Sequence, residues 1–207
     1  MTITEGTNCG FLDTVPTGDP GGTSGFGDRI ISACKFTTSQ AGKINEIGAY
    51  LGYHTENDFE FAIYSHDSGN NRPSSKLGSG TGRYDDDVGW YSVVVDVTLT
   101  NATTYWLAAQ ADGFMSVIDY SSNASYKRDI KTEQSSAPAS WGSSDSTDTS
   151  ICAIYAIWAP AATGTNTQIN IGDDWKEIEG VQINIGDTWK AVAGMQINIG
   201  DTWKEIF

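Results

Sequence analysis

Three consecutive aspartates, Asp85, Asp86 and Asp87, form the densest acidic cluster of the chain. Carboxylate oxygens crowded into a loop suit Ca²⁺. The cluster is therefore a candidate site for a structural calcium ion, which is the one cofactor that the sequence suggests. The spacing of an EF-hand loop is missing, however, and a solvated acidic turn explains the same residues. The sequence leaves both interpretations open.

Aromatic residues in polar surroundings form a second candidate site, because an exposed ring can stack on the apolar C–H face of a sugar. Trp141, within the polar stretch ASWGSSD, is the strongest candidate for glycan binding, followed by Tyr84 and Tyr126. The tryptophans in strand-like runs are expected in the core instead. For Trp141 the alternative role is loop anchoring or core packing.

Sequence patterns typical of catalysis are missing. The two histidines, His54 and His66, fall at strand-to-loop positions, and there is no G-x-S-x-G elbow to supply a nucleophilic serine. The Gly-rich N-terminal segment lacks the Lys-Ser/Thr ending of a phosphate-binding loop. Among 26 acidic residues, a pair at glycosidase spacing would arise by accident. We therefore predict no catalytic residues and no enzymatic activity.

The three cysteines, Cys9, Cys34 and Cys152, lack metal-ligand spacing, and their odd number argues against a complete disulfide framework. Cys34 and Cys152 lie in apolar strand-like runs, where buried free thiols are expected. A bridge between these two cysteines is the alternative. Cys9 lies in Gly-rich irregular sequence and is expected to be the most reactive thiol.

The composition restricts the partners of the chain. Its 26 acidic residues against 12 basic ones give a net charge of −14, and such a surface repels nucleic-acid phosphates and anionic lipid. No apolar run approaches the roughly 20 residues of a membrane span. The start, MTITEGTNCGF, shows no secretory signal. Neither a nucleic acid nor a membrane is expected as a partner.

Turn residues and apolar runs predict an all-β protein. Charged residues are only 18% of the chain, 23 residues are glycine, and there is no convincing helical period. Short runs bounded by Gly, Asn, Asp or Ser predict an antiparallel, jelly-roll-like β-sandwich. A long polar loop is expected from His66 to Gly80, and a Ser/Thr/Asp-rich stretch follows from Thr132 to Ser150. The expected strands are 30–36, 44–53, 59–64, 90–99, 103–110, 114–120 and 151–158.

Changes in composition divide the chain into four segments. Residues 1–28, rich in Gly, Thr and Pro, are expected to form an N-terminal arm or a loop laid over a sheet. Residues 29–158 form the predicted sandwich. Residues 159–167 have the small, uncharged composition of a linker. Residues 168–207 hold three copies of a 14-residue repeat that begins QINIGD.

Each repeat predicts a hairpin of two very short strands. In the first copy Ile169 and Ile171 share a face, Gly172-Asp173 suits a tight turn, and Trp175 lies in the returning strand. Three hairpins give a six-stranded meander, and a β-solenoid is the alternative. A repeat this short cannot bury its own apolar face, so we expect contacts with other subunits. The expected interface residues are Trp175, Trp189, Trp203, Ile169, Ile171, Ile183, Ile185, Ile197 and Ile199.

Several stretches carry a resemblance to known proteins, namely KINEIGAYLG (43–52), FAIYSHDSGNNRPSSKLGSG (61–80), GWYSVVVDVTLTNATTYWLAAQ (89–110), and APASWG followed by ICAIYAIW. They resemble a β-sandwich type of phage virion and bacterial surface proteins that is akin to carbohydrate-binding modules. The tail is similar to INIGDTWK-type repeats at the ends of phage structural proteins. This resemblance implies a structural role in a virion or at a cell surface and supplies no catalytic residues.

These patterns together predict a non-enzymatic structural or assembly protein of a phage-like virion or an extracellular filament. The sandwich is expected to face outward, while the tail contacts other copies of the chain and other structural subunits. The expected location is the virion or an extracellular surface. The alternative function is a carbohydrate-binding adhesin or receptor-binding module, with a glycan as its partner.

Overall fold

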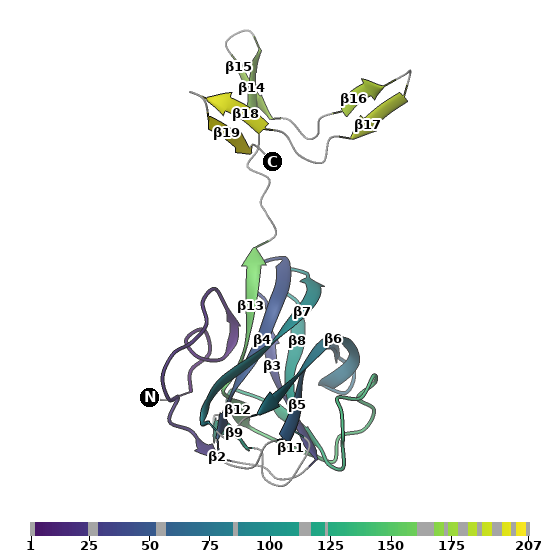
Figure 1. Cartoon of the computed structure of the whole chain (residues 1–207). Coiled ribbons are helices and arrows are strands. Elements are labelled where there is room, and N and C mark those ends of the chain that lie inside the picture. The colour runs from purple at the N-terminus through teal and green to yellow at the C-terminus, as the bar shows by residue number, and fades with distance from the viewer. Residues whose placement is uncertain are drawn as a thin grey trace. The chain divides into compact units, whose positions relative to one another are not determined.

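The computed structural model describes residues 3–24, 29–52, 57–84, 87–111, 117–122 and 124–160, and the backbone of six short strands between residues 168 and 205. Every helix or strand assigned in these residues is a β-strand, so the prediction of an all-β protein is confirmed. The chain divides into two compact units, Met1–Pro160 and Ala161–Phe207 (Figure 1). Among the described residues, no helix is long and apolar enough to cross a membrane.

Two sheets form the first unit, as the predicted sandwich requires. Sheet 1 contains β1 (Gly10–Leu12), β2 (Thr23–Ser24), β4 (Gly42–Gly52), β7 (Gly89–Leu99), β9 (Val117–Ser122), β12 (Ser150–Cys152) and β13 (Ile154–Pro160). Their order is β1-β13-β4-β9-β12, with β7 paired to β4 and β2 paired to β9. The β1–β13 pair is parallel, while the other described pairs of sheet 1 are antiparallel.

Sheet 2 is antiparallel throughout its described pairs. It contains β3 (Ile30–Thr37), β5 (Asn57–Asp67), β6 (Arg72–Tyr84), β8 (Thr104–Ala111), β10 (Arg128–Lys131) and β11 (Ser146–Asp148). The strand order is β11-β10-β3-β8-β5-β6, so the edges are β11 and β6.

The main core lies between the two sheets. Strand β7 alternates strictly along its second half, with Val93, Val95 and Val97 buried and Val94 84% exposed. Such a period of two is expected for a strand with one face on the core and one in water. From sheet 2, Phe61 and Leu107 join the same core.

The middle strands of sheet 2, β3, β5 and β8, are buried on both of their faces. The outer face is covered by residues 132–145, called the covering segment below. A second hydrophobic core forms under it and contains Ile31, Ala33, Ala62, Tyr64, Trp106, Ala108, Ala137 and Trp141. Strands covered on both faces read as continuous apolar runs rather than as alternation, which explains the sequence YWLAA in β8.

The expectation of a long polar loop from His66 to Gly80 is wrong, because these residues complete β5 and form most of β6. The connecting turn is organised by Asp67, whose carboxylate accepts from the backbone N–H groups of Gly69 and Asn70 at 3.0 and 3.2 Å. Strand β6 lies at an edge of sheet 2. An edge strand tolerates polar side chains because one side of it faces solvent.

The expected strand 151–158 is two strands. Residues of β12 pair with β9, and residues of β13 pair with β4. The chain passes from pairing with β9 to pairing with β4 at Ala153. The N–H of Ala153 donates to the Asp119 carbonyl at 2.8 Å, and its carbonyl accepts from the backbone N–H of Tyr50 at 2.9 Å. Apolar composition is the same on both sides of this break, so the sequence pattern does not mark it.

The N-terminal residues belong to the first unit. Strand β1 pairs with β13, and Ile3 and Leu12 are buried. Trp90 Nε1 donates to the Gly18 carbonyl at 2.9 Å, and Trp158 Nε1 donates to Asp13 at 3.1 Å. Residues expected to form an arm therefore lie against sheet 1 and supply two of its short strands.

In the second unit the structure describes three separate two-stranded sheets. They are formed by β14 (Gln168–Ile171) with β15 (Asp174–Glu177), β16 (Gln182–Ile185) with β17 (Thr188–Ala191), and β18 (Gln196–Ile199) with β19 (Thr202–Glu205). Pairing between different repeats, which a meander or a solenoid requires, is not among the described strand pairs.

Candidate functional site

A charged pair on sheet 2 holds the covering segment. Glu60 of β5 accepts from the N–H of Ala137 at 2.7 Å and from Lys76 Nζ of β6 at 3.0 Å. Lys76 Nζ in turn donates to the carbonyl of Ala137 at 2.8 Å. The backbone N–H and carbonyl of Ala137 are thus both bound by the Glu60–Lys76 salt bridge, which is mostly buried.

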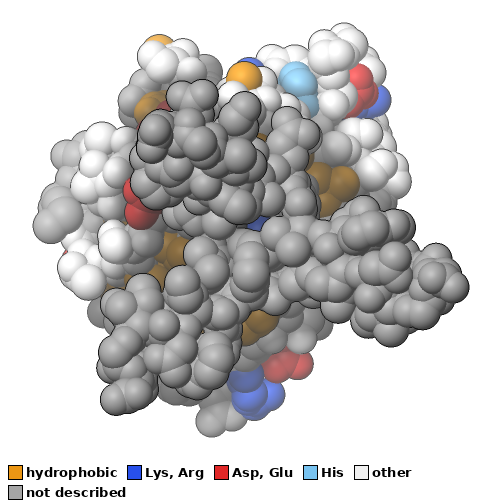
Figure 2. All heavy atoms as spheres, turned by 90° about the horizontal axis from the view of Figure 1, so that it is seen from above, with side chains coloured by type: hydrophobic (Ala, Val, Ile, Leu, Met, Phe, Trp, Pro, Cys, Tyr) orange, Lys and Arg blue, Asp and Glu red, His pale blue; other side chains and the backbone are white. Residues whose placement is uncertain are grey.

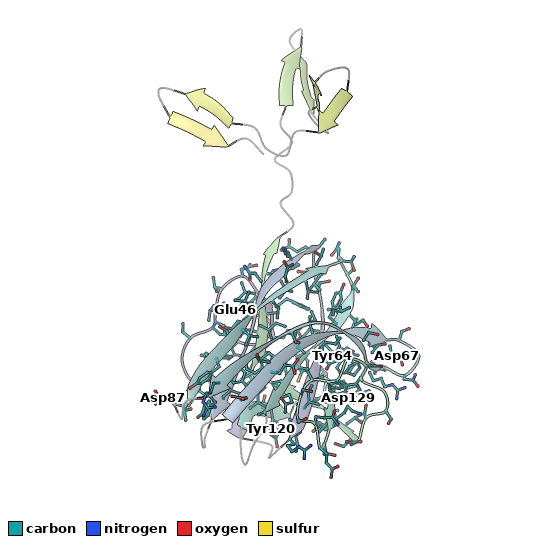
Figure 3. All side chains as sticks on the ribbon, turned by 45° about the vertical axis from the view of Figure 1, so that its right-hand side comes forward. Glu46, Tyr64, Asp67, Asp87, Tyr120 and Asp129 are labelled. Carbon is teal, nitrogen blue, oxygen red and sulfur yellow. The ribbon has the colours of Figure 1, made fainter. Side chains whose placement is uncertain are left out.

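Aromatic and acidic side chains hold the next part of the covering segment. Tyr64 donates from its hydroxyl to the Pro138 carbonyl at 2.8 Å, and its ring contacts Trp141 edge-on with centroids 5.2 Å apart. Trp141 Nε1 donates to the buried carboxylate of Asp129 at 3.2 Å. Tyr64 and Asp129 lie on the same side of the sandwich in Figure 3.

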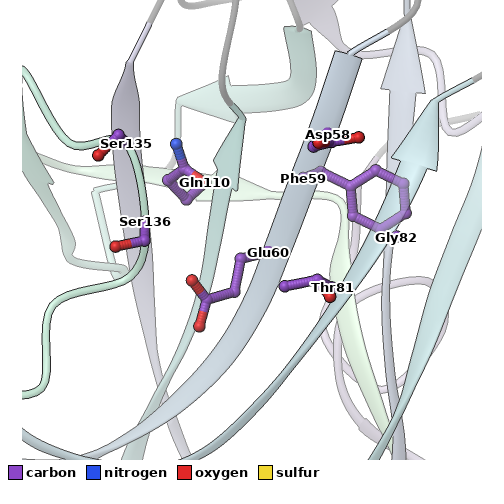
Figure 4. Close-up of a pocket in the computed structure, with 8 residues that line it drawn as sticks. All are labelled: Asp58, Phe59, Glu60, Thr81, Gly82, Gln110, Ser135 and Ser136. Carbon is purple, nitrogen blue, oxygen red and sulfur yellow. The ribbon is translucent and has the colours of Figure 1, made fainter.

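Beside these contacts lies a polar cleft of about 400 Å³ at one end of sheet 2 (Figure 4). It is bounded by β5, β6 and β8 on one side and by the covering segment on the other. Its lining residues are Asp58, Phe59, Glu60, Thr81, Gly82, Gln110, Ser135 and Ser136. Gln110 is buried, and its Nε2 donates to the Gln134 carbonyl at 2.7 Å.

The two carboxylates of the cleft, Glu60 and Asp58, are each paired with a basic side chain. Burial alone would raise the pKa of Glu60, but hydrogen bonds from Ser79 and the Ala137 N–H, together with Lys76, hold that pKa below its ordinary value. Asp58 is largely exposed beside Arg83, with a 3.4 Å contact. Away from the cleft, acidic and basic side chains are interspersed on the face that Figure 2 shows. Fixed donors and acceptors whose charges are paired in this way suit a small neutral, hydroxylated ligand.

Two of the aromatic residues proposed for glycan stacking are core residues. Trp141 is 1% exposed and Tyr84 is 2% exposed, so neither ring offers a face to solvent. Tyr126 is partly buried against the main core. Burial and the neighbouring carboxylate of Glu5 raise the pKa of Tyr126 to about 12. A stacking platform at Trp141 is therefore excluded, because the covering segment folds this side chain inward.

The proposed calcium site falls mostly outside the described residues, which include Asp87 but neither Asp85 nor Asp86. The carbonyl of Asp87 accepts from the Tyr91 hydroxyl at 2.8 Å, and Figure 3 places Asp87 on the opposite side of the sandwich from Asp67. Among the described residues, no group of three or more His, Cys, Asp or Glu could hold a metal ion. The calcium site stays a prediction.

All three cysteines are buried free thiols. This confirms the expectation for Cys34 and Cys152, but the expectation of a reactive Cys9 is wrong. Cys9 is 0% exposed, and burial and the charge of Glu5 raise the pKa of its thiol far above the ordinary value. The Gly-rich sequence around Cys9 folds onto the sandwich rather than into solvent, which the composition does not reveal.

The one histidine in the described residues, His66, has a structural partner. Its Nδ1 accepts from Trp106 Nε1 at 3.1 Å. Burial and the charges of Lys35 and Lys127 lower the pKa of His66 below its ordinary value. This arrangement anchors the Trp106 ring at the edge of the second core. His54 lies outside the described residues.

The expected assembly residues of the tail are described by their strand pairing alone. Asn170 pairs with Trp175, Asn184 with Trp189, and Asn198 with Trp203. The first Ile of each QINI strand pairs with a Lys. The register is therefore the same in all three hairpins. The side chains of the predicted interface lie outside the described part of the structure.

Comparison of the chain with protein-family models finds no matching family, and comparison with curated proteins finds no matching sequence.

Sequence reasoning missed the residues that anchor the covering segment and line the cleft. A signal for two of them was present, because Glu60 and Gln110 interrupt the apolar runs FEFAIY and YWLAAQA. A polar residue within a run that is buried on both faces must find a hydrogen-bond partner. Ser135 and Ser136, by contrast, resemble any other loop serines.

Proposed function

We propose that this chain is a non-enzymatic structural protein of a phage-like virion or extracellular filament, in which a jelly-roll-like sandwich is displayed and the repeat tail mediates subunit contacts. The partners are other copies of the chain and other structural subunits. The single observation that carries the proposal is the identical register of the three tail hairpins, each of which forms its own two-stranded sheet.

An isolated two-stranded hairpin is marginally stable in water. The tail contains three such hairpins, each built from two four-residue strands. Each of them is marginally stable unless its surfaces are covered. Every hairpin also has two strand edges with unpaired backbone groups, which are templates for pairing with another chain. Association with further copies supplies both the missing burial and the missing hydrogen bonds.

The register adds a reason for two-sided contacts. Directly opposed residues of an antiparallel pair lie on one face, so Trp175 belongs to the face of Asn170, and Ile169 belongs to the face of Lys176. By this register the tryptophan and the isoleucines of one hairpin belong to opposite faces. Each hairpin has an apolar position on both faces, which favours stacking between neighbours on either side.

The test is the assembly state of the full chain. Light scattering is measured over a range of concentrations for the wild type and for the Trp175→Ala, Trp189→Ala, Trp203→Ala triple variant. We expect the wild type to form oligomers and the variant to be shifted to monomers. The matched control replaces three exposed residues of β7, Ser92, Val94 and Thr98, with Ala and is expected to assemble as the wild type does. A wild type that is monomeric at every concentration contradicts the proposal.

A second candidate function, the binding of a neutral glycan, is favoured by the polar cleft. Hydroxyl, amide and carboxylate groups line a space of about 400 Å³, and such groups hydrogen-bond sugar hydroxyls. Because the basic side chains Lys76 and Arg83 are already paired with carboxylates, anionic sugars are disfavoured. Calorimetric titration with neutral mono- and oligosaccharides tests this function. Asp58→Ala should abolish binding, whereas Ser92→Ala, on the exposed face of β7, should leave it unchanged.

A further inference from the structure

Two buried cysteines face each other across the sandwich. Cys34 lies in β3 of sheet 2, and Cys152 lies in β12 of sheet 1. The N–H of Cys152 donates to Sγ of Cys34 at 3.2 Å. Exposure is 2% for Cys34 and 0% for Cys152. The fold therefore places Sγ of Cys34 against the backbone of Cys152, which belongs to the opposite sheet.

We propose that Cys34 and Cys152 form an inter-sheet disulfide when the chain folds in the presence of a small-molecule disulfide as oxidant. The cross-link is a modification of the sandwich core and is independent of the function of the tail. In the reduced state the same two residues are the buried free thiols described above.

The chemistry is a balanced thiol–disulfide exchange. The thiolate of Cys152 attacks one sulfur of the oxidant, which forms a mixed disulfide and releases one oxidant thiolate. The thiolate of Cys34 then attacks Sγ of Cys152 and releases the second oxidant thiolate. The two protons lost by the cysteines end on the two released thiols, so the protein loses two electrons and the oxidant gains them.

Where an oxidant does reach the folded core, the surroundings of Cys152 favour its role as the attacking thiolate. Burial opposes ionisation, but a hydrogen bond from Cys34, the positive charge of Arg128 and a hydrogen bond from Ser32 bring the pKa of Cys152 below its ordinary value. Arg128 is held in place by Asp148, which accepts from its Nε at 3.0 Å. A guanidinium next to a thiol is the usual means of activating a cysteine.

Cys9 is the competing partner, because it lies near enough to Cys152 for their charges to interact. Burial and the neighbouring charge of Glu5, however, raise its pKa. Cys9 is also placed on the N-terminal segment of the chain rather than on the facing sheet. The geometry therefore selects Cys34 as the partner of Cys152.

Burial also sets when the bond forms. In the folded reduced chain both sulfurs are shielded, so a dissolved oxidant reaches them slowly, whereas during folding they are accessible. The closed loop spans residues 118 apart in sequence. Cross-links over loops of this size stabilise a fold mainly by restricting the unfolded chain, and a rise in melting temperature of roughly 10 °C follows for a chain of this length.

The experiment refolds the full chain from denaturant with oxidised and reduced glutathione and, in parallel, with dithiothreitol. The products are analysed by thiol counting under denaturing conditions and by peptide mass mapping. With glutathione we expect one remaining thiol, a Cys34–Cys152 linked peptide and the higher melting temperature. Oxidant added to the already folded reduced chain should give the same peptide much more slowly.

Two variants separate the pairings. Cys9→Ser should still cross-link, and Cys34→Ser should not. Three free thiols after oxidative refolding, a Cys9–Cys152 peptide, or stable glutathione adducts at Cys34 and Cys152 would each overturn the proposal. The wild-type mass map decides the outcome even if a variant fails to fold.

Discussion

Replacing Trp141 with alanine is expected to detach the covering segment and to destabilise the first unit strongly. The side chain is among the largest that are fully buried. Removing a buried tryptophan costs about 3–5 kcal/mol, because the lost contacts leave a cavity. In addition, the buried carboxylate of Asp129 loses the indole N–H that donates to it at 3.2 Å, and a buried acceptor left without a donor costs about 1–3 kcal/mol. We therefore expect a loss of at least about 3 kcal/mol.

The assay is urea unfolding of the full chain followed by far-ultraviolet circular dichroism, with thermal unfolding as a second measure. A loss of about 3–5 kcal/mol corresponds to a melting temperature lower by roughly 6–20 °C for a chain of this size. Trp141→Phe is the matched variant. It keeps an aromatic ring beside Tyr64 but removes the N–H, so its loss should be the smaller part, about 1–3 kcal/mol.

The reasoning fails if Trp141→Ala unfolds within about 1 kcal/mol of the wild type, the range of an ordinary surface substitution. Loss of glycan binding together with unchanged stability would instead return Trp141 to the role of an exposed stacking residue. A large loss of stability in Trp141→Ala with none in Trp141→Phe would assign the effect to packing alone and contradict the contribution of the Asp129 hydrogen bond.

Three further outcomes can be checked. Gly80→Val should lower the free energy of unfolding by about 1–3 kcal/mol through overpacking, since a Cβ at Gly80 would lie 2.7 Å from Cβ of Val93, whereas Gly89→Val, with no atom within 4 Å, should be nearly neutral. The pKa of Glu60 is lowered on folding from its ordinary 4.5, so its contribution is present above pH 4.5 and lost as the pH falls through the folded-state pKa; Glu60→Gln should flatten this part of the stability–pH curve. In the native reduced chain, alkylation of all three buried cysteines should be slow, and rapid labelling of any one before unfolding would contradict its burial.

Local patterns in the sequence were sufficient to predict the strands that have one buried and one exposed face. The valines at 93, 94, 95 and 97 predict the strand 90–99 directly, and the structure places β7 at 89–99. The run from Phe59 to Tyr64 is also predicted as a strand from its alternation, although β5 continues to Asp67 and is buried on both faces. These signals are local because the period of a strand depends only on its own backbone geometry.

Strands whose character depends on their neighbours were not predicted. Strand β6 carries Ser, Lys and Gly because it forms an edge, and its glycines let Val93 and Val97 approach closely: a Cβ at Gly78 would lie 2.5 Å from Cγ2 of Val97. The residues next to Gly78 in the sequence do not predict that Val97 packs against it. The same holds for the break between β12 and β13, which exists because two different strands are available as partners.

The sequence by itself determined that the protein is all-β, that residues of the repeat tail pair into short hairpins, and that few residues have the types and spacing of catalytic groups, since each follows from residue type and near-neighbour spacing. Only the tertiary structure decided that Trp141 and Cys9 are buried, that Glu60 binds the covering segment, and that Cys34 meets Cys152. These contacts join residues far apart in the chain. They form only when the two sheets and the covering segment pack against one another, which is a property of the whole fold.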